Sequence, residues 1–249
     1  MCTLVLAHCL LSGRPLVVLA NRDELLSRPS SPPGLLRSTP AAFGGRDELQ
    51  GGTWCGINAS GLFVGLTNLA GGPIDLSRRS RGRLVLDLLG LRDATQAAES
   101  LERLQADVYN GFNVIASDGR TAVRAQYDGT ASVHMLEPGV HAATNWRDKS
   151  EGAAKRLRAE ALVREVVEAE PDTDTLLADL MRVGRTHERD GDPRASLCCH
   201  MGGYGTRSST VLVAGPGELR FLHSEGAPCR HPYDDYSSRA AELVGAPTA

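Results

Sequence analysis

The sequence predicts an α+β fold of two stacked, mainly antiparallel sheets flanked by helices, a four-layer α/β/β/α arrangement. Its 249 residues alternate between strand and helix patterns, in the order strands, helices, strands, helices, strands. Short turn sequences join neighbouring strands, which is typical of antiparallel pairing. The amphipathic helices need apolar surfaces to cover, and the outer faces of the two sheets provide them.

The first two strands are predicted to form a hairpin. An apolar run from about Cys2 to Leu10 is followed by the turn sequence SGRP and then by LVVLAN, residues 16–21. Residues 27–42 contain four prolines and no periodicity, so we expect an exposed loop that is long enough to shape a pocket. The segments GTWCGIN and LFVGLTN, joined by ASG, predict a second hairpin.

The middle of the chain changes to helical spacing and then returns to strands. Residues 81–105 predict two helices with a break near 90–93. Asp118-Gly119 is a strong hairpin turn between the strand segments FNVIAS and RTAVRAQYD. The segment VHMLEPGVHAATN, residues 133–145, adds further strand.

The last part of the chain repeats this order. Residues 150–168 and 173–184 predict two helices. A final hairpin is expected around Pro216-Gly217. With no linker and no internal repeat, we predict one domain over residues 1–249, with a frayed tail after Pro232.

Composition excludes several classes of function. The net charge of −3 and the aromatic content of 4% give no electrostatic or stacking basis for a nucleic-acid partner. No stretch of about 20 apolar residues could span a membrane. Thr3 to Leu11 lacks the preceding basic residues of a signal peptide. We therefore expect a cytoplasmic protein.

The six cysteines predict mostly buried thiols. No Cys-x-x-Cys pair is present, which argues against a structural zinc site. The segment CCHMGGYG, residues 198–205, contains ligand types suited to a soft metal or haem, but its spacing fits no established site. We expect a glycine-rich loop there and no metal site.

Cys2 is the exception, because it directly follows the initiator methionine. Methionine is normally removed before a small residue, which would leave Cys2 with both a thiol and a free α-amino group. The amine, with a pKa of about 7.7–8.0, suits a general base at neutral pH. It could take the thiol proton and leave a thiolate to attack a carbonyl. The alternative is an ordinary strand cysteine.

Three sequence features together resemble the NRDE family, also called the transport and Golgi organisation family. They are Cys2, the tetrapeptide NRDE at Asn21 to Glu24, and the segment GGTWCGINASG. The resemblance runs from Met1 to about Ser224. It implies a branch of the N-terminal-nucleophile hydrolase superfamily, related to the choloylglycine hydrolases and penicillin V acylases, and the same four-layer fold.

The resemblance also implies catalytic roles. Cys2 matches the nucleophile, and Asp23 matches an aspartate that hydrogen-bonds the N-terminal amine or the thiol. Asn68 matches an oxyanion-hole asparagine, a role that suits a neutral amide donor. Asn145 matches a second asparagine that orients the amine, and Arg207 matches an arginine that would lower the pKa of the thiol.

Most of these roles have a structural alternative. Asp23 could be a turn carboxylate paired with Arg22, and the two asparagines could cap strand ends. In the bile-salt branch an arginine stands three residues before the aspartate, where this chain has Ala20. Neighbouring strand residues point to opposite faces, so Arg22 enters the pocket of Asp23 only if the strand ends or bulges there.

Two functions follow as hypotheses. In the first, Cys2 attacks a small acylated substrate as an amide hydrolase or acyltransferase, through a covalent acyl-enzyme and without a cofactor. In the second, the pocket carries haem or acyl-CoA and other lipids, as the resemblance implies, and Cys2 is idle or a ligand. In either case, the residues expected to contact substrate or cargo are Asn21, Arg22, Glu24 and Trp54.

Overall fold

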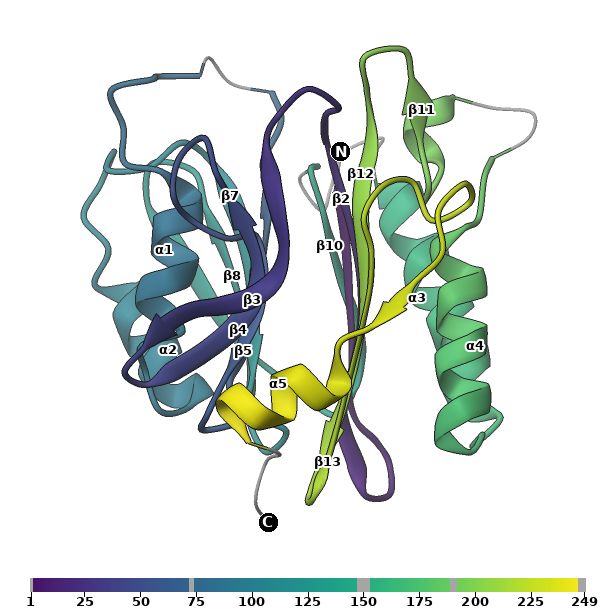
Figure 1. Ribbon diagram of the computed structural model, residues 1–249. Helices are drawn as coiled ribbons and strands as arrows, with labels where there is room; N and C mark the ends of the chain where they lie inside the picture. The colour runs from purple at the N-terminus through teal and green to yellow at the C-terminus, as the bar shows by residue number, and fades with distance from the viewer. Residues whose placement is uncertain (1, 72–73, 147–152, 189–191, 246–249) are drawn as a thin grey trace.

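The computed structural model describes residues 2–71, 74–146, 153–188 and 192–245. Figure 1 shows two sheets face to face, with helices on the outer side of each. The predicted α+β, four-layer α/β/β/α fold is therefore confirmed.

The first sheet is antiparallel throughout its described pairs. Its strand order is β10-β1-β2-β12-β13-β14, and the short β11 also pairs with β12. The predicted first and last hairpins are its β1–β2 and β12–β13 pairs. Its strands are β1 (Thr3–Leu11), β2 (Arg14–Leu25), β10 (Gly139–Thr144), β11 (His200–Met201), β12 (Tyr204–Gly215), β13 (Glu218–Ser224) and β14 (Asp234–Asp235).

The second sheet follows the sequence order β3-β4-β5-β6-β7-β8-β9, so each strand pairs with its neighbours in the chain. This order results from the succession of hairpins that the turn sequences predict. Its strands are β3 (Ser30–Ser38), β4 (Ala41–Asp47), β5 (Cys55–Asn58), β6 (Phe63–Asn68), β7 (Phe112–Ser117), β8 (Ala122–Tyr127) and β9 (Ala131–Leu136).

In the described part of the chain, four helices form the two outer layers. Helices α1 (Arg81–Leu88) and α2 (Ala94–Glu102) pack on the second sheet, separated at the predicted break. Asp93 begins α2 by accepting a hydrogen bond from the Gln96 amide. Helices α3 (Ala153–Glu168) and α4 (Thr173–Gly184) cover the first sheet. No helix in the described ranges is long and apolar enough to cross a membrane.

The layer between the sheets is apolar. Leu4 and Leu6 of β1 meet Phe43, Ile57 and other side chains of the second sheet in one buried cluster. The short helix α5 (Ser237–Val244) packs against β13 and β4 and adds two side chains to this cluster. In Figure 1, α5 lies at the opposite end of the two sheets from the N-terminus.

Two expectations about local structure are corrected. Most of residues 27–42, expected as a loop, is strand β3 at the edge of the second sheet. Its prolines, Pro32 and Pro33, fall within a register irregularity, where the missing amide donors break no ladder. The expected frayed tail after Pro232 is instead β14 and α5. The first three positions of the helix predicted over 150–168 lie outside the described residues.

Candidate active site

Cys2 lies directly before β1, on the face of the first sheet that meets the second sheet. Thr3 pairs with Asn21 of β2, so Cys2 lies beside Arg22 across the two strands. The Cys2 residue is buried, and its thiol donates to the main-chain oxygen of Asp23 at 3.6 Å. It forms part of the wall of a cavity of about 840 Å³. Other residues lining this cavity include Arg22, Glu24, Trp54, Asn68, Asn145 and Tyr204.

Burial raises the pKa of the Cys2 thiol, and the nearby Asp23 carboxylate raises it further. The Arg22 charge lowers this pKa, but the net shift is upward. The thiol is therefore protonated at neutral pH. To act as a nucleophile it needs a base within hydrogen-bond reach.

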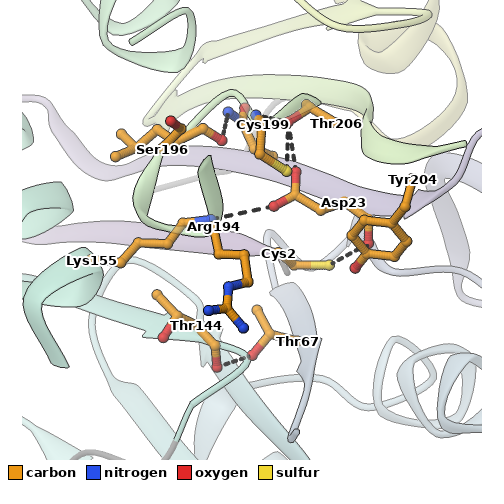
Figure 2. Close-up of polar contacts among 12 residues, drawn as sticks. Cys2, Asp23, Thr67, Thr144, Lys155, Arg194, Ser196, Cys199, Tyr204 and Thr206 are labelled. Carbon is orange, nitrogen blue, oxygen red and sulfur yellow. Dashed lines mark hydrogen bonds and ion pairs between the residues drawn. The ribbon is translucent and has the colours of Figure 1, made fainter. Parts of the chain in front are cut away.

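The Asp23 side chain lies on the opposite face of β2, toward α3. Its Oδ1 accepts a hydrogen bond from the Thr206 hydroxyl at 2.6 Å, and its Oδ2 lies 3.3 Å from Lys155 Nζ (Figure 2). Both side chains of this ion pair are almost completely inaccessible, with 0% of Asp23 and 2% of Lys155 exposed. A buried charge is tolerated only when it is paired and hydrogen-bonded, as here.

The hydrogen bond from the Cys2 thiol goes to the main-chain oxygen of Asp23 and not to the carboxylate that was predicted to bond it. The same oxygen accepts a hydrogen bond from the Tyr204 hydroxyl at 2.9 Å as well as the weak one from Cys2 (Figure 2). Tyr204 and Thr206 both come from β12, which pairs with β2 through the NRDE segment. The Thr206–Asp23 and Ser208–Arg22 pairs enclose one extra residue on β12, a β-bulge at Arg207.

Arg22 lies on the cavity side of β2. Its guanidinium carbon is 4.4 Å from the centre of the Trp54 ring, a cation–π distance. The residue is 6% exposed, and Nη1 has no hydrogen-bond partner among the described residues. Burial lowers the pKa of Arg22, yet an arginine stays charged at neutral pH.

A second arginine reaches the same cavity from α1. Arg81 Nη1 donates to the Gly111 carbonyl at 3.0 Å, and burial lowers the pKa of its guanidinium. Neither Arg22 nor Arg81 has a carboxylate partner within 4.0 Å in the described ranges. The cavity lining as a whole contains five arginines and five carboxylates, but these two guanidinium groups are left available to an anionic ligand.

The two predicted asparagines come together with Cys2. Asn68 ends β6 and Asn145 directly follows β10, and both line the cavity. The Thr67 hydroxyl donates to the Thr144 carbonyl at 2.9 Å, which ties these strands of different sheets together (Figure 2). Asn145 Oδ1 is buried without a hydrogen-bond partner among the described residues.

The structure places Arg207 away from the thiol, contrary to the prediction. Its guanidinium pairs with Glu225 at 3.3 Å, and it is absent from the residues that line the cavity. Among the two arginines considered for the thiol, Arg22 is the one whose charge acts on Cys2. Arg207 is displaced because it is the extra residue of the β12 bulge.

The remaining predicted binding residues divide between the two faces of β2. Asn21 faces the helices, where Nδ2 donates to the carbonyls of Gly184 and Leu197, so it holds the fold and does not line the cavity. Glu24 and Trp54 do line the cavity. Trp54 packs so tightly on Gly45 that a Cβ there would lie 2.4 Å from the ring.

Four residues of the site were not predicted from the sequence: Lys155, Arg81, Tyr204 and Thr206. Only Lys155 leaves a signal, because it occupies the apolar stripe of its helix. Buried Ala159, Val163 and Val166 follow it at spacings of three and four residues. A lysine on such a stripe indicates a buried partner.

Comparison with known proteins identifies the family. Residues 1–224 match the sequence profile of the family described as Transport and Golgi organisation 2. The chain belongs to the Transport and Golgi organisation 2 family. It is similar to the Transport and Golgi organization protein 2 homologs of Homo sapiens, at 33% identity, and Bos taurus, at 31%. Each alignment covers 83% of this chain and 84% of the relative.

Solved structures show the fold of this family member. A mutant conjugated bile acid hydrolase from Clostridium perfringens superposes with a TM-score of 0.60 at 11% identity, covering 99% of this chain and 95% of that one. The Caenorhabditis elegans N-acylethanolamine-hydrolyzing acid amidase ortholog gives 0.54 at 12%, covering 98% and 97%. Penicillin V acylase from Agrobacterium tumefaciens gives 0.52 at 11%, covering 90% and 86%. The predicted N-terminal-nucleophile hydrolase fold is thus confirmed.

Proposed function

We propose that this family member is an N-terminal-cysteine amide hydrolase or acyltransferase that acts on a small acylated substrate. One observation carries the proposal: Cys2 forms part of a cavity wall together with Asn68 and Asn145. A nucleophile beside neutral amide donors is the arrangement that acyl transfer requires. The structural relatives named above as a hydrolase, an amidase and an acylase support the same reaction class.

The proposed mechanism begins with removal of Met1, a residue outside the described part of the chain. The freed α-amino group of Cys2 takes the thiol proton, which the raised pKa of the thiol makes necessary. The thiolate attacks the amide carbon, and an asparagine amide donates to the resulting oxyanion. The C–N bond then breaks, and the protonated α-amine returns the proton to the leaving amine. Water or a second amine resolves the thioester.

Two arginines of the cavity favour a substrate with an anionic group. Arg22 and Arg81 both line the cavity without a carboxylate within ion-pair distance in the described ranges. A carboxylate or phosphate on the substrate would pair with such guanidinium groups in two-point geometry. The amide of such a substrate would then lie beside the Cys2 thiol, at a fixed distance from the anionic group.

Chemical labelling tests the proposal. We expect intact-mass analysis to show loss of Met1, and an electrophilic acyl probe to label Cys2. Cys2→Ala should abolish labelling and turnover of an anionic acyl amide, whereas Cys9→Ala should retain both, because Cys9 is an exposed thiol outside the cavity lining. Retained Met1, together with no amide turned over, would contradict the hydrolase proposal.

The pH dependence of alkylation tests the role of the amine. In a variant with one bulky residue inserted before Cys2, which blocks Met1 removal, the raised thiol pKa predicts iodoacetamide labelling that grows only at alkaline pH. In the processed chain we expect labelling to rise near the amine pKa of about 8 and then level off. Identical profiles for the two forms would exclude the amine as base.

Arg22 and Arg81, taken without Cys2, favour a second function, that of a carrier. The same cavity could carry an anionic cargo such as haem or acyl-CoA, with Cys2 taking no chemical part. Titration with each cargo separates the two proposals, because Cys2→Ala should then bind as tightly as the parent protein. A loss of binding in Arg22→Gln but not in Cys2→Ala, without amide turnover, favours the carrier.

A further inference from the structure

A second cluster of chemically active side chains lies outside the cavity. It contains His187 from the segment after α4, Cys198 and His200 from the segment that leads into β12, and Cys229 from the loop after β13. One ligand atom from each of these four side chains lies within 4.8 Å of all the others. Three stretches of chain that are distant in sequence therefore bring two thiols and two imidazoles to one point.

The distances within the cluster suit a tetrahedral metal ion. Zinc bond lengths of about 2.3 Å to sulfur and 2.0–2.1 Å to nitrogen give edges of about 3.8 Å between two sulfurs and 3.6 Å between sulfur and nitrogen. Here Cys198 Sγ lies 3.5 Å from Cys229 Sγ. His200 Nε2 lies 3.1 Å from Cys229 Sγ and 4.0 Å from Cys198 Sγ. The His187 and His200 rings stack with centroids 5.3 Å apart.

We propose that His187, Cys198, His200 and Cys229 bind one zinc ion. Two thiolates and two imidazoles in tetrahedral geometry form a donor set typical of zinc, and four protein ligands leave no position open for substrate. The site is therefore structural. On binding, each thiol releases its proton to solvent.

A disulfide explains less of this geometry. The short separation of the two sulfurs would also allow Cys198 and Cys229 to be oxidised to a disulfide, but that bond would use only two of the four donors. A disulfide would not explain why the two imidazoles lie close to the sulfurs. The sequence predicted no metal site here, because the ligands do not follow the spacing of an established site.

The zinc ion would brace the segment that supports Asp23. Cys199, between two of the ligands, donates its amide to the Thr206 hydroxyl at 2.9 Å, and its carbonyl accepts from the Thr206 amide at 2.9 Å. Thr206 in turn donates to the Asp23 carboxylate. The metal would thus fix the β11–β12 region independently of the chemistry at Cys2.

Elemental analysis of the full chain tests the site. Purified under reducing conditions without chelator, the protein should contain about one zinc per chain. The double variant Cys229→Ser/His187→Ala should contain at least about tenfold less. Cys9→Ser is the matched control, because Cys9 is also an exposed thiol beside a histidine, 3.5 Å from His8 Nδ1, yet lies outside the cluster. It should keep the full zinc content.

Cobalt(II) substitution of the parent chain keeps the test decisive if the double variant does not fold. The visible bands of tetrahedral thiolate–cobalt coordination are expected at one equivalent, with loss on adding zinc. Absence of both bound zinc and these bands would overturn the proposal, as would equal zinc loss in Cys9→Ser. A Cys198–Cys229 disulfide that mass spectrometry finds in the reductively purified chain would also overturn it.

Discussion

The two faces of β2 at the NRDE segment have opposite properties. On the helix side, Asn21 and Asp23 are buried, and their side chains bond to main-chain carbonyls, a hydroxyl and a lysine. On the cavity side, Arg22 and Glu24 face a space of about 840 Å³, and part of the Arg22 guanidinium has no hydrogen-bond partner among the described residues. The four-residue motif therefore has fully hydrogen-bonded side chains on one face and a partly unbonded guanidinium on the other.

This difference separates two kinds of requirement on neighbouring residues. The helix-side residues fix the strand, because a broken buried network costs several kcal/mol. The cavity-side residues can be exchanged at a small cost in stability, but they determine what the cavity accepts. Substitutions on the two faces should therefore affect different measurements.

The largest expected effect on stability is on the helix side. Lys155→Met removes the partner of a buried carboxylate and should lower the free energy of unfolding by about 3–5 kcal/mol, measured by urea denaturation. Arg164→Met is the matched control, because it removes an exposed cation from the same helix and should change stability by less than about 0.5 kcal/mol. Equal effects would mean that the Asp23–Lys155 pair is not a stabilising element.

The second effect appears in binding. Arg22→Gln removes a cation that stacks on Trp54, so stability should fall by no more than about 2 kcal/mol. Affinity for an anionic acyl amide, measured by calorimetry, should fall at least about tenfold, because a charged hydrogen bond is lost. Arg22→Lys, which keeps the charge, should restore part of it. Unchanged affinity in Arg22→Gln would contradict the proposed role of the cavity side in binding the anionic group.

The smallest effect is expected at Glu24. This residue lies 3.9 Å from Arg28, and both side chains are partly exposed. Arg28 keeps a closer pair with Asp47 at 2.6 Å. Glu24→Gln should therefore alter the unfolding free energy by about 0.5 kcal/mol or less in thermal or urea melts. A decrease in the unfolding free energy of more than about 2 kcal/mol would show that the cavity side also stabilises the fold.

Local patterns predicted most of the fold, because hairpins and amphipathic helices are determined by neighbouring residues. Helix α4 begins and ends where its apolar spacing predicts. The strand β3 was missed because prolines normally indicate a loop. A strand tolerates prolines when it lies at a sheet edge, as β3 does. The position of a strand within a sheet depends on all the other strands, so the local sequence does not show it.

The site was predictable only as far as the family resemblance reached. It put Cys2, Asn68, Asn145 and Arg207 in one site. The first three line the same cavity, whereas Arg207 pairs with Glu225 and is not among the lining residues. A bulge of one residue cannot be read from the sequence of β12 alone. The His187–Cys229 cluster was missed for a related reason, because its ligands come from three separate segments.

The two prolines of β3 have a consequence beyond this chain. A free sheet edge offers a row of amide groups on which a strand of another molecule can be added. Pro32 and Pro33 carry no amide donor, and the register irregularity at these residues interrupts the row on one border of the second sheet. Self-association by strand addition is therefore disfavoured along this border.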